Sequence, residues 1–182
     1  MHNPQGEAQY YSEVKFLPEP EASDILDLQD IRSHANICPT ANIDPEKESI
    51  FAVYDVSADL QERYQSHFDY KVSVRWQVVT ADLPIHYDWG VSSDKYLYLI
   101  DAGGDDVKTE FWSELPNDPD AGGSICTLGR TLAFEMQEGV NKWFRINVKT
   151  PHRVVNIVRP RIALIIRPNV LAFWERTGPL CP

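Results

Sequence analysis

The residues best placed to support chemistry are a histidine and an aspartate two positions apart, His86 and Asp88. On a β-strand, residues i and i+2 project from the same face, so this pair could present an imidazole nitrogen and a carboxylate oxygen to one metal ion. The pattern is weak evidence alone, because a chain with 5 histidines and 27 acidic residues can contain it by chance. A second copy, His67 and Asp69, lies at the end of a predicted helix, ahead of the first clear strand. We therefore take His86 and Asp88 as the candidate metal ligands.

A metal centre of this type needs a third ligand. Iron(II) is commonly bound by two histidines and one carboxylate, which leave three adjacent positions for substrate and oxygen. His152 is the only histidine downstream of Asp88, and strands far apart in sequence can be neighbours in a jelly roll. Taken singly, each histidine also has a structural interpretation: His86 as a surface residue in a turn, and His152 as a hydrogen-bonded residue after Pro151.

A cluster of arginines stands out in the otherwise acidic chain: Arg153, Arg159, Arg161 and Arg167. Arg161 begins the segment RIALIIR, whose alternate positions share one face. An arginine that points inward from an apolar strand is unfavourable without an anion, and a guanidinium pairs well with a carboxylate. Arg159 and Arg167 have the same parity, but Arg159 precedes Pro160 at a turn and Arg167 lies at the far end. Arg161 is therefore the preferred candidate among these arginines to bind a dicarboxylate cosubstrate.

The segments that must position these residues are predicted to be short strands. From residue 70 onward, apolar and polar residues alternate with the period of two of a half-buried strand. Gly, Pro, Asn and Asp clusters, including glycine pairs at 103–104 and 122–123, separate the segments. This spacing predicts a mainly β sandwich, jelly roll or barrel. The segments are KVSVRWQVV (71–79), KYLYLID (95–101), VKTEFW (107–112), TLAFEM (131–136), WFRINV (143–148), RVVNIV (153–158), RIALIIR (161–167) and VLAFWE (170–175).

The first third of the chain is expected to be a mixed helical layer. Spacing of apolar residues predicts a helix at about 23–34, with Ser23 as its N-cap, and a second helix at 58–68. We expect one domain spanning 1–182, with an N-terminal layer over 1–69 and the β core over 70–182.

Composition excludes several classes of protein. A net charge of −10 disfavours nucleic acid as a partner, and the sequence contains no apolar run long enough for a membrane helix. The N-terminus lacks the features of a secretory signal, so we expect a cytoplasmic protein. Cys38, Cys126 and Cys181 are far apart, which disfavours a disulfide scaffold or a thiolate zinc site.

The motifs together resemble a known family. The H-x-D pair, the YLYLID strand followed by T-x-F, the sequence P-H-R-V and the R-x-A strand are similar to those of the Fe(II)- and 2-oxoglutarate-dependent oxygenases, particularly the prolyl-4-hydroxylase-like branch. The stretch VRWQVVTADLPIHYDWG is similar to the lead-in to the metal motif of that branch. The resemblance covers residues 70–168 and not the first 69. The chain departs from the pattern at the glycine pair 103–104, which lies five residues before Thr109 and not directly before it.

The resemblance implies a double-stranded β-helix, or jelly roll, with flanking N-terminal helices. It implies iron ligation by His86, Asp88 and His152, with O2 at a remaining position. Arg161 would bind the distal carboxylate of 2-oxoglutarate. Tyr98 would be a second donor to that carboxylate, and Tyr96, on the same face, is an alternative.

The implied activity is dioxygenase chemistry that hydroxylates an amino-acid side chain, peptidyl or free, or another small molecule. The main alternative is a non-catalytic, cupin-like jelly-roll binding module. A serine or cysteine nucleophile is poorly supported, since there is no G-x-S-x-G motif. A zinc hydrolase would lack the H-E-x-x-H helix and would leave Arg161 without a role.

Overall fold

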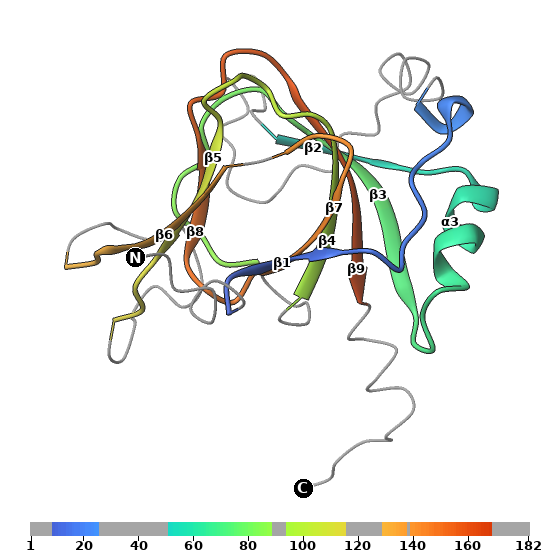
Figure 1. The fold of residues 1–182 in the computed structure, drawn as a ribbon, viewed down its shortest axis with the longest axis horizontal. Coiled ribbons are helices and arrows are strands. Elements are labelled where there is room, and N and C mark those ends of the chain that lie inside the picture. Colours follow the sequence, from blue (N-terminus) through green and yellow to red (C-terminus); the bar gives the residue numbers. More distant parts are fainter. Residues whose placement is uncertain (1–8, 26–50, 89–93, 116–128, 138, 169–182) are drawn as a thin grey trace, which may run out of the picture.

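Two antiparallel sheets face each other in the computed structural model, which describes residues 9–25, 51–88, 94–115, 129–137 and 139–168 (Figure 1). Within these ranges the larger sheet has the strand order β1-β7-β4-β9-β3-β2 and the smaller sheet has the order β6-β5-β8. The elements are β1 (Tyr11–Val14), β2 (Phe51–Asp55), α3 (Ala58–Gln65), β3 (Val72–Val79), β4 (Asp94–Asp101), β5 (Lys108–Trp112), β6 (Leu132–Gln137), β7 (Trp143–Asn147), β8 (His152–Val155) and β9 (Arg161–Pro168).

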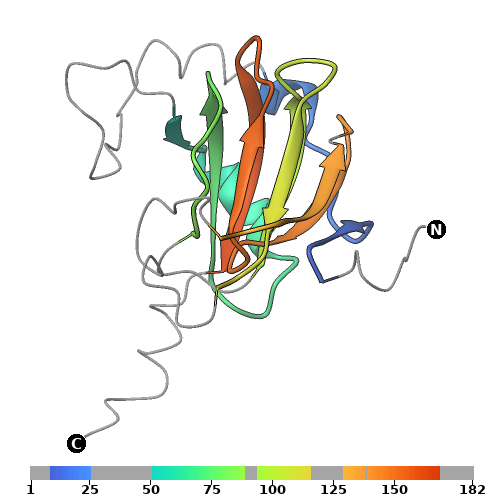
Figure 2. The same ribbon diagram turned by 90° about the vertical axis from the view of Figure 1, so that its left-hand side faces the viewer.

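This arrangement confirms the predicted double-stranded β-helix. Strands distant in sequence are paired, such as β3 with β9 and β4 with β7, and Figure 2 shows β3, β9, β4 and β7 side by side with α3 behind them. Seven of the predicted segments form strands, and the eighth, 170–175, lies outside the described residues. β8 ends at Val155, earlier than predicted, because Asn156 has a φ of 66°, a left-handed conformation that does not continue a strand.

The N-terminal third contributes strands as well as helices. β1 pairs with β7 and β2 pairs with β3, so both extend the larger sheet at its edges, which the sequence analysis did not predict. The predicted second helix is confirmed as α3, although it ends at Gln65, three residues earlier than predicted. Of the first predicted helix, residues 22–25 are helical and the rest lies outside the described residues. This helix begins before Ser23, so the prediction of Ser23 as its N-cap is wrong. The Asp24 carboxylate accepts a hydrogen bond from the Glu21 N–H (2.7 Å).

The central strands β4 and β9 of the larger sheet are buried on both faces. The outer face of this sheet packs against α3 and the N-terminal segment through an outer core formed by Leu17, Leu60, Tyr64, Val72, Val74, Trp76, Tyr96, Tyr98, Trp143, Leu164 and Ile166. Between the two sheets lies an inner core formed by Leu97, Leu99, Phe111, Met136, Phe144, Ile146, Val148, Ala163 and Ile165. Alternate residues of β4 and β9 therefore belong to different cores.

Two glutamines of α3 complete the hydrogen bonding of β3 where β2 does not reach. The Gln61 side chain donates to the Val72 carbonyl (3.1 Å) and accepts from the Val74 N–H (2.9 Å). The Gln65 carbonyl accepts from the Val72 N–H (3.0 Å). These bonds fix the helix to the sheet and cover an exposed strand edge. Among the described residues, no helix is long and apolar enough to cross a bilayer.

A tight turn at Gly103 holds the end of β4 against the start of β9. Gly103 has a φ of 89°, and its carbonyl accepts hydrogen bonds from the Val158 and Arg159 N–H groups (3.0 and 2.9 Å). A Cβ atom added at this glycine would lie 2.9 Å from the Cβ of Arg161. The absence of a side chain at this position is therefore required for the observed placement of Arg161.

We predict that Gly103→Ala lowers the free energy of unfolding by about 1–3 kcal/mol, because it combines an unfavourable φ with a steric clash. Urea denaturation measures this change. Gly139→Ala is the matched control, since the nearest atom to an added Cβ there is 4.0 Å away and φ lies outside the left-handed range. Equal stability of the two variants would contradict the prediction.

Candidate metal centre

A pair of reciprocal backbone hydrogen bonds places His86 beside His152. The His86 N–H donates to the His152 carbonyl (2.9 Å) and the His152 N–H donates to the His86 carbonyl (3.0 Å). This isolated antiparallel bridge adds the segment around His86 to the edge of β8. Directly opposed residues of this kind project side chains to the same face, and the imidazole centroids are 4.5 Å apart.

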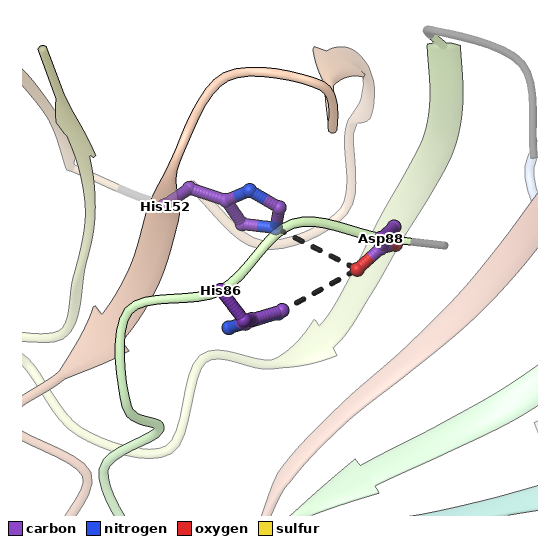
Figure 3. A group of neighbouring side chains, drawn as sticks. All are labelled: His86, Asp88 and His152. Atoms are coloured by element: carbon purple, nitrogen blue, oxygen red, sulfur yellow. Dashed lines mark ion pairs between the residues drawn. The ribbon is translucent and has the colours of Figure 1, made fainter. Parts of the chain in front are cut away.

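Asp88 completes a three-residue group (Figure 3). Its backbone N–H donates to the Val148 carbonyl (3.1 Å), and its side chain is buried. The Oδ1 atom of Asp88 lies 3.5 Å from Nε2 of His86 and 3.9 Å from Nε2 of His152. One potential ligand atom from each residue lies within 4.8 Å of the others. The structure thus brings the three sequence-predicted ligands together, and their binding of a metal remains a prediction.

Both imidazoles are oriented by backbone carbonyls. Nδ1 of His86 lies 2.8 Å from the Pro84 carbonyl, and Nδ1 of His152 lies 2.9 Å from the Thr150 carbonyl. A carbonyl oxygen only accepts hydrogen bonds, so we assign the proton of each ring to Nδ1. In a neutral imidazole the lone pair is then on Nε2, the atom that faces Asp88. Such a hydrogen bond on the second nitrogen is typical of histidines that bind metals.

The protonation states of this group leave lone pairs available to a metal ion. Burial and the neighbouring His86 lower the pKa of the His152 imidazole to about 3, so this ring is neutral at neutral pH. Burial alone would raise the pKa of Asp88, but the positive charges of Lys95 and Arg167 lower it well below its usual value. A carboxylate oxygen and nitrogen lone pairs therefore face one another. Two imidazole nitrogens and one carboxylate oxygen form a donor set that suits iron(II) or a similar divalent ion.

The second oxygen of Asp88 has two cationic partners that the sequence analysis did not predict. Oδ2 accepts hydrogen bonds from Nη2 of Arg167 (2.7 Å) and from Nζ of the buried Lys95 (3.2 Å). Burial lowers the pKa of Lys95, whereas Asp88 opposes that shift. Nε of Arg167 is buried and makes no hydrogen bond among the described residues. Lys95 could have been recognised from the sequence, because it is a basic residue within the mainly apolar and aromatic segment that forms β4.

A small cavity between the sheets adjoins the three-residue group. Arg161 is buried at the start of β9, and its side chain lines this cavity, while its binding of a cosubstrate remains a prediction. Arg159 is instead half-exposed and pairs with Asp101 (3.2 Å). The cavity is lined by Gln77, Leu83, His86, Lys95, Leu97, Thr109, Ile146, His152, Val154 and Arg161.

The expectation for Tyr98 and Tyr96 is wrong. Both belong to the outer core, where Tyr98 packs against Trp143 with ring centroids 5.3 Å apart. The cavity is lined instead by Lys95 and Leu97 from the opposite face of β4. Because both faces of β4 are buried, the alternation in its sequence could not indicate which face lies toward the cavity.

Comparison with known proteins identifies the fold. No family model and no curated protein matches the sequence. A prolyl hydroxylase from Trichoplax adhaerens has a similar structure, with a TM-score of 0.58 and 9% identity over 92% of this chain and 89% of that chain. A prolyl-4-hydroxylase from Pseudomonas putida has a TM-score of 0.53 and 9% identity over 90% of this chain and 95% of that chain. Vicilin from hazelnut, Corylus avellana, has a TM-score of 0.40 and 12% identity over 70% of this chain and 32% of that chain. This chain therefore spans about a third of vicilin. The chain therefore resembles prolyl hydroxylases in its fold.

We predict that the metal-free protein becomes less stable as the pH falls from 7 to 5. The pKa of His152 is about 3 in the folded state and near the ordinary value of 6.5 in the unfolded chain, so over this range the unfolded chain binds a proton that the folded chain does not. The expected loss is about 2 kcal/mol. Asp88, whose pKa is lowered by folding, adds a further loss only below about pH 4.

Urea denaturation at pH 7 and pH 5, with a chelator present, measures this loss. His152→Gln removes the titrating group and should show a smaller decrease over the same interval. An equally steep decrease in the variant would rule out His152 as its source.

Proposed function

We propose that this protein is an Fe(II)- and 2-oxoglutarate-dependent dioxygenase that hydroxylates an amino-acid side chain, peptidyl or free, or another small molecule. The observation that carries the proposal is the orientation of the two imidazoles. Their Nδ1 atoms are held by backbone carbonyls, and both Nε2 atoms face one carboxylate oxygen, Asp88 Oδ1. This is the donor set of a facial iron site, on a fold similar to that of prolyl hydroxylases.

The residues of the chain divide into two roles. His86, Asp88 and His152 would hold the iron, and Arg161 would bind the distal carboxylate of 2-oxoglutarate. When bound, iron and cosubstrate would supply the oxidative chemistry, with 2-oxoglutarate converted to succinate and carbon dioxide as O2 is activated. The protein would position these groups at the cavity between the sheets.

The position of Arg161 supports a dicarboxylate as cosubstrate. Its side chain lines the cavity that also contains His86 and His152, where a guanidinium can pair bidentately with a carboxylate. The similar Trichoplax protein is a prolyl hydroxylase in complex with a peptide fragment, which favours a peptidyl substrate among the candidates.

A non-catalytic, cupin-like binding module is the second candidate. The observation that favours it is the contact of Asp88 with Lys95 and Arg167, since this carboxylate already has cationic partners without a metal ion. Such a module would not be stabilised by Mn(II) and 2-oxoglutarate. A thermal-shift measurement separates the candidates, because a ligand that binds only the folded state raises its stability.

We predict that the purified protein forms succinate only when Fe(II) and 2-oxoglutarate are both present. His152→Ala removes one ligand and should reduce the rate by about 100-fold or more. His67→Ala, the same change in the exposed second H-x-D copy, is the matched control and should retain the rate. Unchanged succinate formation in His152→Ala would refute the assignment. Peptides and free amino acids can then be compared by the extra succinate that each elicits.

We also predict that Arg161→Met raises the dissociation constant of 2-oxoglutarate by about 30-fold or more, since a charged partner of a buried carboxylate is lost. Isothermal titration in the presence of Mn(II) measures this change. Arg159→Met is the control, because that arginine is half-exposed and pairs with Asp101. Equal affinities in the two variants would remove Arg161 from the proposed role.

A further inference from the structure

The two oxygens of Asp88 face different environments. Oδ1 faces the imidazoles, whereas Oδ2 contacts Arg167 at 2.7 Å and Lys95 at 3.2 Å. Asp88 and Lys95 are both buried. Because its second oxygen is held by two cations, this carboxylate offers a single oxygen toward the two Nε2 atoms.

The charges around this group are mostly positive. One carboxylate, Asp88, lies among Lys95, Arg167 and Arg161, and Nζ of Lys149 lies 3.4 Å from the Asp88 backbone carbonyl. Among the described residues, no Asp or Glu lines the adjacent cavity. A divalent cation adds two further positive charges to a region of low dielectric, where repulsion between like charges is strong. A dianion bound beside the metal would offset them.

We infer that Lys95 weakens binding of the metal ion alone and thereby makes tight metal binding depend on a dicarboxylate bound in the same cavity. This inference rests on the proposed function and concerns the regulation of the same site. Arg167 makes the shorter contact with Oδ2 and holds the carboxylate, whereas Lys95 supplies the additional buried charge. By linkage, a dicarboxylate that strengthens metal binding is itself bound more tightly when the metal is present.

A purely supporting role for Lys95 predicts the opposite result. If Lys95 only orients Asp88, its removal should weaken metal binding by about 10–100-fold, as for other residues that support metal ligands. If Lys95 acts through its charge, its removal should strengthen binding of the metal alone. The sign of the change therefore separates the two roles.

The experiment is calorimetric titration of the chelator-treated full chain with Mn(II), with and without saturating 2-oxoglutarate. We expect 2-oxoglutarate to strengthen Mn(II) binding by more than about tenfold in the original protein. In Lys95→Met, of similar length but without charge, Mn(II) alone should bind about tenfold more tightly, and the effect of 2-oxoglutarate should shrink by a similar factor.

The matched control is Lys142→Met. Lys142 is exposed, pairs with Glu13 and precedes β7 at the end of the β4–β7 pair far from Lys95. This variant should bind Mn(II) like the original protein, with and without 2-oxoglutarate. If Lys95→Met does not fold, Lys95→Gln removes the charge and retains a polar group that can reach Asp88.

Two outcomes would overturn the inference, and they are distinguishable. If the original protein binds Mn(II) with 2-oxoglutarate but Lys95→Met binds Mn(II) alone no more tightly, the inference fails and the proposed function stands. If the original protein binds no Mn(II) even with 2-oxoglutarate, the proposed function fails and the inference fails with it.

Discussion

The candidate site depends on one register, the pairing of His86 with His152 through two backbone hydrogen bonds. A shift of this pairing by one residue would turn one imidazole to the other face of the sheet. The position of β8 is also fixed along its other edge, where it pairs with β5 and Phe111 lies opposite His152. Asp88 is two residues after His86, so in an extended chain its side chain projects to the same side as the His86 imidazole. The potential ligands are therefore positioned by sheet hydrogen bonding, which holds side chains more rigidly than loops do.

The space between the sheets contains several polar groups beside its apolar core. Gln77, Lys95, Thr109 and Arg161 line the cavity beside apolar residues of the inner core. Burial of such groups is unfavourable unless each has a partner, and replacing buried ion pairs with apolar side chains is often neutral or stabilising. These polar groups lie beside the convergent imidazoles, so a ligand bound at the proposed site would contact polar as well as apolar side chains.

The sequence predicted the parts of the fold that have a local pattern. Alternating apolar residues located seven strands, and the types of His86, Asp88 and His152 identified the group that the structure brings together. Two kinds of feature were missed. The edge strands β1 and β2 contain no fully buried residue and so lack a clear apolar alternation. The contact of Arg167 with Asp88 joins residues with no local relation in sequence. Tyr98 was misassigned because both faces of β4 are buried. The alternation separates the two faces but does not show which of them lies toward the cavity.

The carbonyls that orient the imidazoles belong to residues two positions earlier, Pro84 and Thr150. Carbonyl groups are present whatever side chain those positions carry. The direction of each ring is therefore encoded by chain conformation and does not require a particular neighbouring residue type. Side chains around the two histidines can therefore be substituted without changing the orientation of the imidazole rings. The sequence around the histidines can diverge while this geometry is retained.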